Sequence, residues 1–476
     1  MKKIISVLLL ASMLASLAAC GDNDNDKDKS NNNDTDVQAE LPAGIEKKEY
    51  KEDFTILVPE WGLYNNYFFS DDTGTDAMSK ALYERELTVE DHLGVTISTE
   101  WIDDIHQLPI KVREVNMSGD DLYQLVLTHC ISGVSGMVTD NLLVDMNTID
   151  TMNFDADYYN HIANENLAVK GHQYYAISDF MLPDPNAILF NKDMIAEHNL
   201  EDPYELVRNG EWTIDKMMEM MAVVSKDTGN GRRDKDDIYG LGTPADWYLC
   251  DAIYSSGLML VEKNDEGDFE LAIDKGERVY TMIEKYDALL NNFSTTYVYD
   301  HKDVDTDNHF TIDKEQSLFG ITAVNQLNLL RDAEVEFGIL PYPKLDETQD
   351  GYYALDWSGL MCIPASAQNL DMIGEVIELL SYYSDDAVIP AYFDIMLGEK
   401  LSRDAESREM LSIIFDNTVF DAGMNYFGFT GNMYKLFFMV GHQLAIQPTF
   451  SLSSFLATYA PGARAELQEF NEAVAE

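Results

Sequence analysis

Residues 92–101 read His-Leu-Gly-Val-Thr-Ile-Ser-Thr-Glu-Trp, and they join the end of one element to the beginning of the next. Before this stretch, apolar residues from Met78 to Leu93 recur at the spacing of one helix face, and Gly94 is a typical helix-ending residue. After it, residues 95–101 are rich in β-branched side chains. The stretch therefore predicts a helix that leads directly into a strand.

The neighbouring segments extend this pattern in both directions. Residues 54–58 form a short apolar run before Pro59 and predict a first strand. A helix is predicted over 107–118, ended by Gly119, and a third strand over 123–128. This alternation of strands and helices predicts a parallel sheet with right-handed crossovers.

A second region of strands and helices begins near residue 186. Its candidate strands are followed by helix signals, among them Thr213 as an N-cap. The last hundred residues are mainly helical in pattern. The predicted strands are 187–190, 317–324, 336–340 and 352–363, and the predicted helices begin near 192 and at 214.

The N-terminus has the pattern of an exported lipoprotein. Lys2 and Lys3 precede an apolar run that ends at Ala19, too short to span a bilayer but long enough for a signal peptide. Leu-Ala-Ala-Cys at 17–20 resembles a bacterial lipobox, in which the cysteine carries lipid such as palmitate. An ordinary cleaved signal with a chance cysteine is the alternative. The polar residues after Cys20 predict a flexible tether.

Charge and cysteine content limit the function classes. The net charge is −53, which disfavours nucleic acid and anionic lipid as partners. Cys130, Cys250 and Cys362 stand in apolar surroundings without a Cys-x-x-Cys pair, so we expect buried free thiols, although one disulfide among the three stays open.

Several segments, taken in order, resemble the solute-binding proteins of ABC-type importers, in the large family (family 1) that mostly captures sugars. The segment 92–97 is similar to that family's early helix-to-strand junction. Ser-Gly-Asp-Asp-Leu-Tyr-Gln-Leu-Val at 118–126 resembles its "GDxxDLV" strand entry, although Gln124 replaces an acidic residue. Three further segments resemble family motifs: residues 189–194 resemble the "YNKDL" crossover into the second lobe, residues 211–215 the "TWDE" helix start, and residues 337–343 the "VLPxP" return strand.

The resemblance implies an α/β, two-lobed, type II periplasmic-binding-protein fold with a ligand cleft between discontinuous lobes. The predicted parts are a signal peptide (1–19), an acidic tether (20–49), a first lobe (50–182 plus 340–366) and a second lobe (183–339 plus 367–476). We expect hinge crossings near 180–187, 338–345 and 364–368. The resemblance also implies ABC permease subunits as partners and a lipid-anchored place on the outer face of a Gram-positive-type cell membrane.

Some candidate ligand-binding residues follow predicted strands, because ligands of open parallel sheets sit beyond the carboxyl ends of the strands. The others lie in the strand region near the third crossing or in loops and turns. Aromatic rings pack on the apolar face of a sugar, and aspartate and asparagine hydrogen-bond its hydroxyls. Most of the many aromatic residues must nevertheless belong to the core. The candidates are Trp61, Tyr64, His129, Asp179, Trp247, Asn325, Asp356, Trp357 and Tyr426.

Residues 227–237 resemble the EF-hand-like calcium loop that many relatives carry at this place. Calcium needs several oxygen ligands around a tight glycine turn, and Gly231 takes the glycine position. The first half of the loop is one residue short, so a polar turn is the alternative, and no cofactor is otherwise expected. The candidate ligands are Asp227, Asn230, Asp234 and Asp237.

Enzyme motifs are missing from the sequence. It holds no His-Glu-x-x-His, no Gly-x-Ser-x-Gly and no phosphate-binding Gly-x-x-x-x-Gly-Lys segment. We therefore expect a binding protein for a small molecule, most simply a carbohydrate, rather than an enzyme. A secreted glycoside hydrolase and a ligand-binding lipoprotein serving a sensor kinase are the alternatives.

Overall fold

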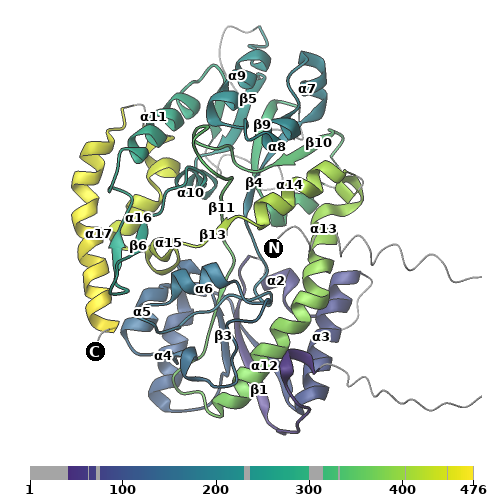
Figure 1. Ribbon diagram of the computed structural model, residues 1–476, viewed down its shortest axis with the longest axis vertical. Helices are drawn as coiled ribbons and strands as arrows, with labels where there is room; N and C mark the ends of the chain where they lie inside the picture. The colour runs from purple at the N-terminus through teal and green to yellow at the C-terminus, as the bar shows by residue number, and fades with distance from the viewer. Residues whose placement is uncertain are drawn as a thin grey trace, which may run out of the picture. The chain divides into compact units, whose positions relative to one another are not determined.

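A computed structural model describes residues 41–62, 64–70, 76–229, 236–299, 315–330, 333–402, 404–447 and 449–474. Contacts divide the chain into residues 1–41 and one compact unit, Pro42–Glu476. The lipobox and Cys20 lie outside the described residues. All that follows concerns the compact unit, which Figure 1 shows as a ribbon.

The first lobe is built on a four-stranded sheet of order β12-β3-β1-β2. β1 pairs in parallel with β2 and β3, as the alternating pattern predicts, while β12 is antiparallel to β3. The crossover helices α3 and α4 are followed by the C-cap residues Gly94 and Gly119. Both glycines have a left-handed backbone conformation, which is favourable for glycine because it has no Cβ atom. The lobe contains β1 (Asp53–Pro59), α2 (Tyr64–Tyr67), α3 (Ala77–Leu93), β2 (Thr96–Ile102), α4 (Leu108–Ser118), β3 (Leu125–Thr128), α5 (Val134–Thr139), α6 (His161–Leu167) and β12 (Leu360–Cys362).

The second lobe is built on a five-stranded mixed sheet of order β10-β4-β9-β5-β8. Its central strands are buried along their whole length, and Thr213 caps α9 by accepting a hydrogen bond from the Lys216 amide, as predicted. The lobe contains β4 (Asn186–Asn191), α7 (Lys192–His198), α8 (Pro203–Arg208), α9 (Ile214–Val224), β5 (Tyr239–Pro244), α10 (Asp251–Ser255), α11 (Arg278–Leu290), β8 (Thr296–Tyr299), β9 (Ser317–Ala323) and β10 (Phe337–Leu340).

Small sheets and C-terminal helices complete the unit. A hairpin of β6 and β7 packs against the long helix α17, and β11 pairs in parallel with β13. In Figure 1, α17 runs along one side of the unit, beside α16 and β6. These elements are β6 (Val261–Lys263), β7 (Phe269–Leu271), β11 (Ala354–Leu355), α12 (Leu370–Tyr383), α13 (Ile389–Ser402), α14 (Ala405–Phe415), β13 (Thr418–Val419), α15 (Ala422–Phe427), α16 (Gly431–Phe437) and α17 (Leu452–Val474).

Two extended segments cross between the lobes and pair with each other. The first leads to β4 through Asp184 and Pro185, close to the predicted position. The second runs from β11 to β12, and Pro185 forms a β-bridge with Asp356 on it. The Trp357 amide also donates to the Asp184 carbonyl at 3.2 Å. The two crossings therefore form one hydrogen-bonded unit.

The second and third crossings lie further along the chain than predicted. Residues 341–345 stay on the second lobe, since Trp212 Nε1 donates to the Pro341 carbonyl at 2.9 Å and Lys344 bridges to Thr213. The third crossing is helical rather than extended. α12 packs on α3 of the first lobe, a π-helical turn (Ser384–Val388) follows, and α13 leads to α14 beside β10. The positions expected from the resemblance, 338–345 and 364–368, therefore precede the crossings that the structure shows.

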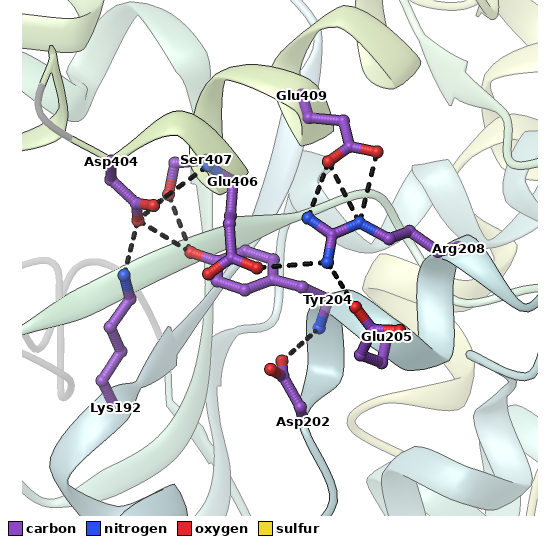
Figure 2. A network of polar contacts seen from close by, with 9 residues as sticks. All are labelled: Lys192, Asp202, Tyr204, Glu205, Arg208, Asp404, Glu406, Ser407 and Glu409. Carbon is purple, nitrogen blue, oxygen red and sulfur yellow. Dashed lines mark hydrogen bonds and ion pairs between the residues drawn. The ribbon is translucent and has the colours of Figure 1, made fainter.

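A polar network fixes α14 to α7 and α8 of the second lobe (Figure 2). Asp404, the N-cap of α14, accepts hydrogen bonds from Lys192, Tyr204 and Ser407. Burial raises the pKa of Asp404, but these hydrogen bonds together lower it to about 2. Arg208 joins the same helices through Glu406 and Glu409. The third crossing is thus tied to the second lobe at its far end.

Two further expectations concern cysteines and membrane spans. Cys130, Cys250 and Cys362 are buried free thiols, as predicted. Among the described residues, none of the helices has the length and apolar content needed to cross a bilayer.

Candidate functional site

A cavity of about 460 Å³ lies where both lobes and both extended crossings meet. Tryptophan side chains from three separate segments line it, together with two histidines and several amide side chains. Among the described residues that line it, none is lysine or arginine. The lining residues are Trp61, Gly62, His106, His129, Ile131, Asp184, Asn186, Trp247, Tyr248, Ala323, Asn325, Gln326, Trp357 and Phe429.

The first-lobe wall comes from the loops after β1 and β3. Trp61 follows β1 and is 43% exposed, with its ring centroid 6.3 Å from that of His129. His129 caps the short helix after β3: its Nδ1 accepts from the Ile131 amide, so Nε2 carries the proton and donates to the Trp357 carbonyl at 2.9 Å. Burial lowers the pKa of His129 to about 4, so the imidazole is neutral at pH 7.

The second-lobe wall comes from the loops after β5 and β9. Trp247 is 38% exposed and begins a short helix whose N-cap, Asp246, accepts from the Trp247 amide at 2.8 Å. Tyr248 donates its hydroxyl to Gln326 Oε1 at 3.0 Å, which orients that amide. These loops lie at the carboxyl ends of parallel strands, where ligands of α/β sheets bind.

The floor of the cavity is made by the paired crossings. Asp184 Oδ2 accepts from Asn325 Nδ2 at 2.8 Å, and Asp184 Oδ1 is buried without a hydrogen-bond partner. Asp356 lies directly behind and accepts from the Asp184 and Ser358 amides at 3.0 and 2.8 Å. Burial, reinforced by Asp356, raises the pKa of Asp184 to about 8, and burial raises that of Asp356 to about 6.

Solved structures with the same architecture are solute-binding proteins. The GacH receptor of Streptomyces glaucescens, solved unliganded and with acarbose, aligns at a TM-score of 0.52 and 14% identity, covering 89% of this chain and 97% of that one. The ABC substrate-binding protein Lmo0181 of Listeria monocytogenes, in complex with cycloalternan, aligns at 0.53 and 12% identity, covering 88% and 98%. The chain has the fold of the ABC-transporter solute-binding proteins. This confirms the fold expected from the sequence.

Not every protein with the solute-binding fold was solved with a sugar. UgpB of Mycobacterium tuberculosis, in complex with glycerophosphocholine, aligns at a TM-score of 0.55 and 14% identity, covering 86% of this chain and 98% of that one. No known family profile matches the chain, and no curated protein does. The ligand must therefore be argued from the cavity of this chain.

In this solute-binding fold, five of the predicted ligand residues line the one cavity described above: Trp61, His129, Trp247, Asn325 and Trp357. They come from positions 61 to 357 of the sequence, and Trp61, His129 and Asn325 were selected because they follow predicted strands. Their contact with a ligand stays a prediction.

Four other predicted residues lie outside that cavity. Tyr64 is buried, and its hydroxyl donates to the Thr128 carbonyl at 2.6 Å. The same hydroxyl lies so close to Gly359 that a Cβ atom at that position would collide with it. Tyr426 is fully buried and donates to the Leu167 carbonyl at 2.7 Å, so it belongs to the core. Asp356 does not line the cavity but accepts a hydrogen bond from the amide of Asp184, which does. Asp179 lies beside Asp385 at the helical crossing, where burial first and Asp385 second raise its pKa to about 7.

Nine of the fourteen lining residues were not predicted from the sequence, among them His106, Asp184, Gln326 and Phe429. Asp184 stands between two prolines immediately before β4, and Gln326 is next to the predicted Asn325. Both could have been found by extending the strand-end rule to the residues before a crossing strand and to the neighbours of each candidate. His106 lies in a short 3-10 helix after β2 and Phe429 in a turn after α15, and no pattern there points to the cavity.

The candidate calcium loop is only partly described. Asn230 and Asp234 lie outside the described residues. Asp237 is buried, and its Oδ1 accepts from the Thr228 amide and hydroxyl at 2.8 and 3.0 Å, while Asp227 accepts from the Gly229 amide. No cluster of three or more metal-ligating side chains occurs among the residues that the structure covers. The calcium site stays a prediction.

Proposed function

We propose that this protein is the extracellular substrate-binding component of an ABC importer and captures a carbohydrate between its lobes. The observation that carries the proposal is the composition of the cavity, where exposed tryptophans from both lobes face amide and carboxyl groups. Tryptophan rings pack on the apolar face of a pyranose, and amides hydrogen-bond its hydroxyls. The fold supports a capture role, since it places this cavity at the crossings.

Capture works through a shift between open and closed forms. A ligand that touches Trp61 on one lobe and Trp247 on the other makes both contacts only when the lobes are close together. It therefore binds the closed form more tightly and raises its population. The closed form then delivers the ligand to the permease. No covalent chemistry is needed in this cycle.

The test is a thermal-shift screen against oligosaccharides, amino acids and peptides. We expect at least one saccharide to raise the Tm, because a ligand that binds only the folded state stabilises it by mass action, by about 2.7 kcal/mol at 100 times its Kd. Incubation of that saccharide with the protein should release no hydrolysis product. Stabilisation by peptides alone would contradict the carbohydrate assignment, and turnover would contradict the binding role.

We further propose that lipid on Cys20 anchors the protein to the outer face of the cell membrane, with the following polar residues as a tether. The support is the Leu-Ala-Ala-Cys segment after an apolar run of signal-peptide length. Labelled palmitate should be incorporated by the wild type and lost in Cys20→Ser. Equal labelling of both, or release of the wild type into the medium at the level of the variant, would rule the anchor out.

A further inference from the structure

The floor of the cavity carries acidic groups that lack a cationic partner. Asp184 and Asp356 are joined through the Asp184 amide, and Asp251 lies behind them, held by Asn186 Nδ2 at 2.8 Å and the Leu355 amide at 3.0 Å. Within the described part of the chain, no lysine or arginine pairs with any of the three. Three carboxyl groups thus share a buried region whose hydrogen bonds come from neutral donors.

Asp184 is the member of this group that lines the cavity. One of its oxygens accepts from Asn325, and the other, Oδ1, is buried and has no donor. A buried carboxylate without full hydrogen bonding and without a counter-charge is costly, so it either keeps a proton or acquires a cation. The lining residues that the structure describes offer neither a lysine nor an arginine there.

The walls above Asp184 suit a cation as well as a sugar. Trp61, Trp247 and Trp357 come from three separate segments and line the same cavity as Asp184, and the negative faces of indole rings attract a cation within about 6 Å. His129 does not oppose a cation, because its burial keeps the imidazole neutral at pH 7. Aromatic rings and a carboxyl group that line one cavity provide both interactions that a protonated amine requires.

We propose that the ligand of this cavity is a saccharide that carries a protonated amino group, and that Asp184 is the residue that selects it. The proposal rests on the carbohydrate-capture function above and specifies its substrate class. The ammonium group supplies the donor that Asp184 lacks and the positive charge that the floor lacks. The sugar ring packs on the tryptophans.

Binding of such a ligand is coupled to a proton. Burial and Asp356 raise the pKa of Asp184 to about 8, so the empty cavity holds Asp184 largely protonated at pH 7. Among the described residues, the other titratable groups that interact with Asp184 are Tyr67, Tyr248 and Tyr392. Their pKa values are all raised from 10, so they stay neutral. An arriving ammonium group favours the carboxylate, and the displaced proton passes to the buffer.

The experiment compares saccharides in matched pairs in which amino groups replace the hydroxyls at C2, such as glucosamine with glucose and chitosan tetramer with cellotetraose. Titration calorimetry at about pH 7, in buffers with different ionisation heats, measures affinity and proton release together. We expect the amino member of at least one pair to bind about 10- to 100-fold more tightly, with release of up to one proton, because charge-assisted hydrogen bonds are the stronger ones.

Two variants make the result specific. Asp184→Asn should bring the amino and neutral members to within about threefold of each other and abolish proton release, because the amide cannot ionise. Asp421→Asn, which changes a fully buried aspartate outside the cavity, should keep the preference. Equal affinity of amino and neutral members for the wild type, or an unchanged preference in Asp184→Asn, overturns the inference. If no saccharide of either kind binds, the carbohydrate function itself fails.

Discussion

Replacing Trp61 or Trp247 by alanine should lower the affinity for the captured saccharide by about 10- to 100-fold and leave the unliganded protein folded. Each ring is more than a third exposed, so its removal opens no void in the core. On binding, each ring would be covered by the ligand, and anchors of this kind contribute about 2 kcal/mol or more. Calorimetric Kd values and the Tm without ligand measure the two effects separately.

Trp101→Ala is the matched control for these variants. Trp101 is 37% exposed on β2, packs on Phe69 and does not line the cavity. Its loss should leave the Kd unchanged. An unchanged Kd in both Trp61→Ala and Trp247→Ala would show that the ligand binds elsewhere.

Replacing Asp421 by alanine should destabilise the protein by about 3 to 5 kcal/mol, since each unpaired buried donor costs about 1 to 3 kcal/mol. Asp421 is fully buried and caps α15 by accepting from the Gly423 and Met424 amides at 2.5 and 3.3 Å. Its second oxygen accepts from the Leu260 amide at 2.6 Å, next to β6. Alanine leaves the closest of these donors without an acceptor, and chemical denaturation measures the loss.

Two comparisons define what the Asp421 result means. Asp76 also caps a helix, α3, but in an exposed position, so Asp76→Ala should cost only about 1 kcal/mol. Asp421→Asn keeps one carbonyl oxygen and should fall between the two. If Asp421→Ala costs no more than Asp76→Ala, the connection between α15 and β6 contributes nothing to stability.

The sequence predicted the first lobe well because its elements are local. Helix 77–93 and strand 96–102 each have a clear periodicity, and Gly94 separates them. The second and third crossings were misplaced because the resemblance gave only their approximate positions, and no local pattern tells whether residues 341–345 stay on a lobe or leave it. Which of these occurs depends on Trp212 and Thr213, more than a hundred residues earlier.

The candidate site was predicted in part for a similar reason. The strand-end rule finds residues such as Trp61 and His129, since each follows a recognisable strand. It cannot tell a ring that faces the cavity from one that faces the core, as Tyr64 and Tyr426 show. Their burial is decided by distant partners, the Thr128 and Leu167 carbonyls, which no local pattern reveals.

The pairing of the two extended crossings has a mechanical consequence. Asp184 and Trp357 lie on the pivot itself, where the lever arm is short, so a ligand resting on them loses little contact as the lobes swing apart. Trp61 and Trp247 lie on the two lobes, away from the pivot, so lobe opening would separate them more. The pivot residues would then set the affinity of the open form for the ligand, and the lobe residues would set the stability of the closed form.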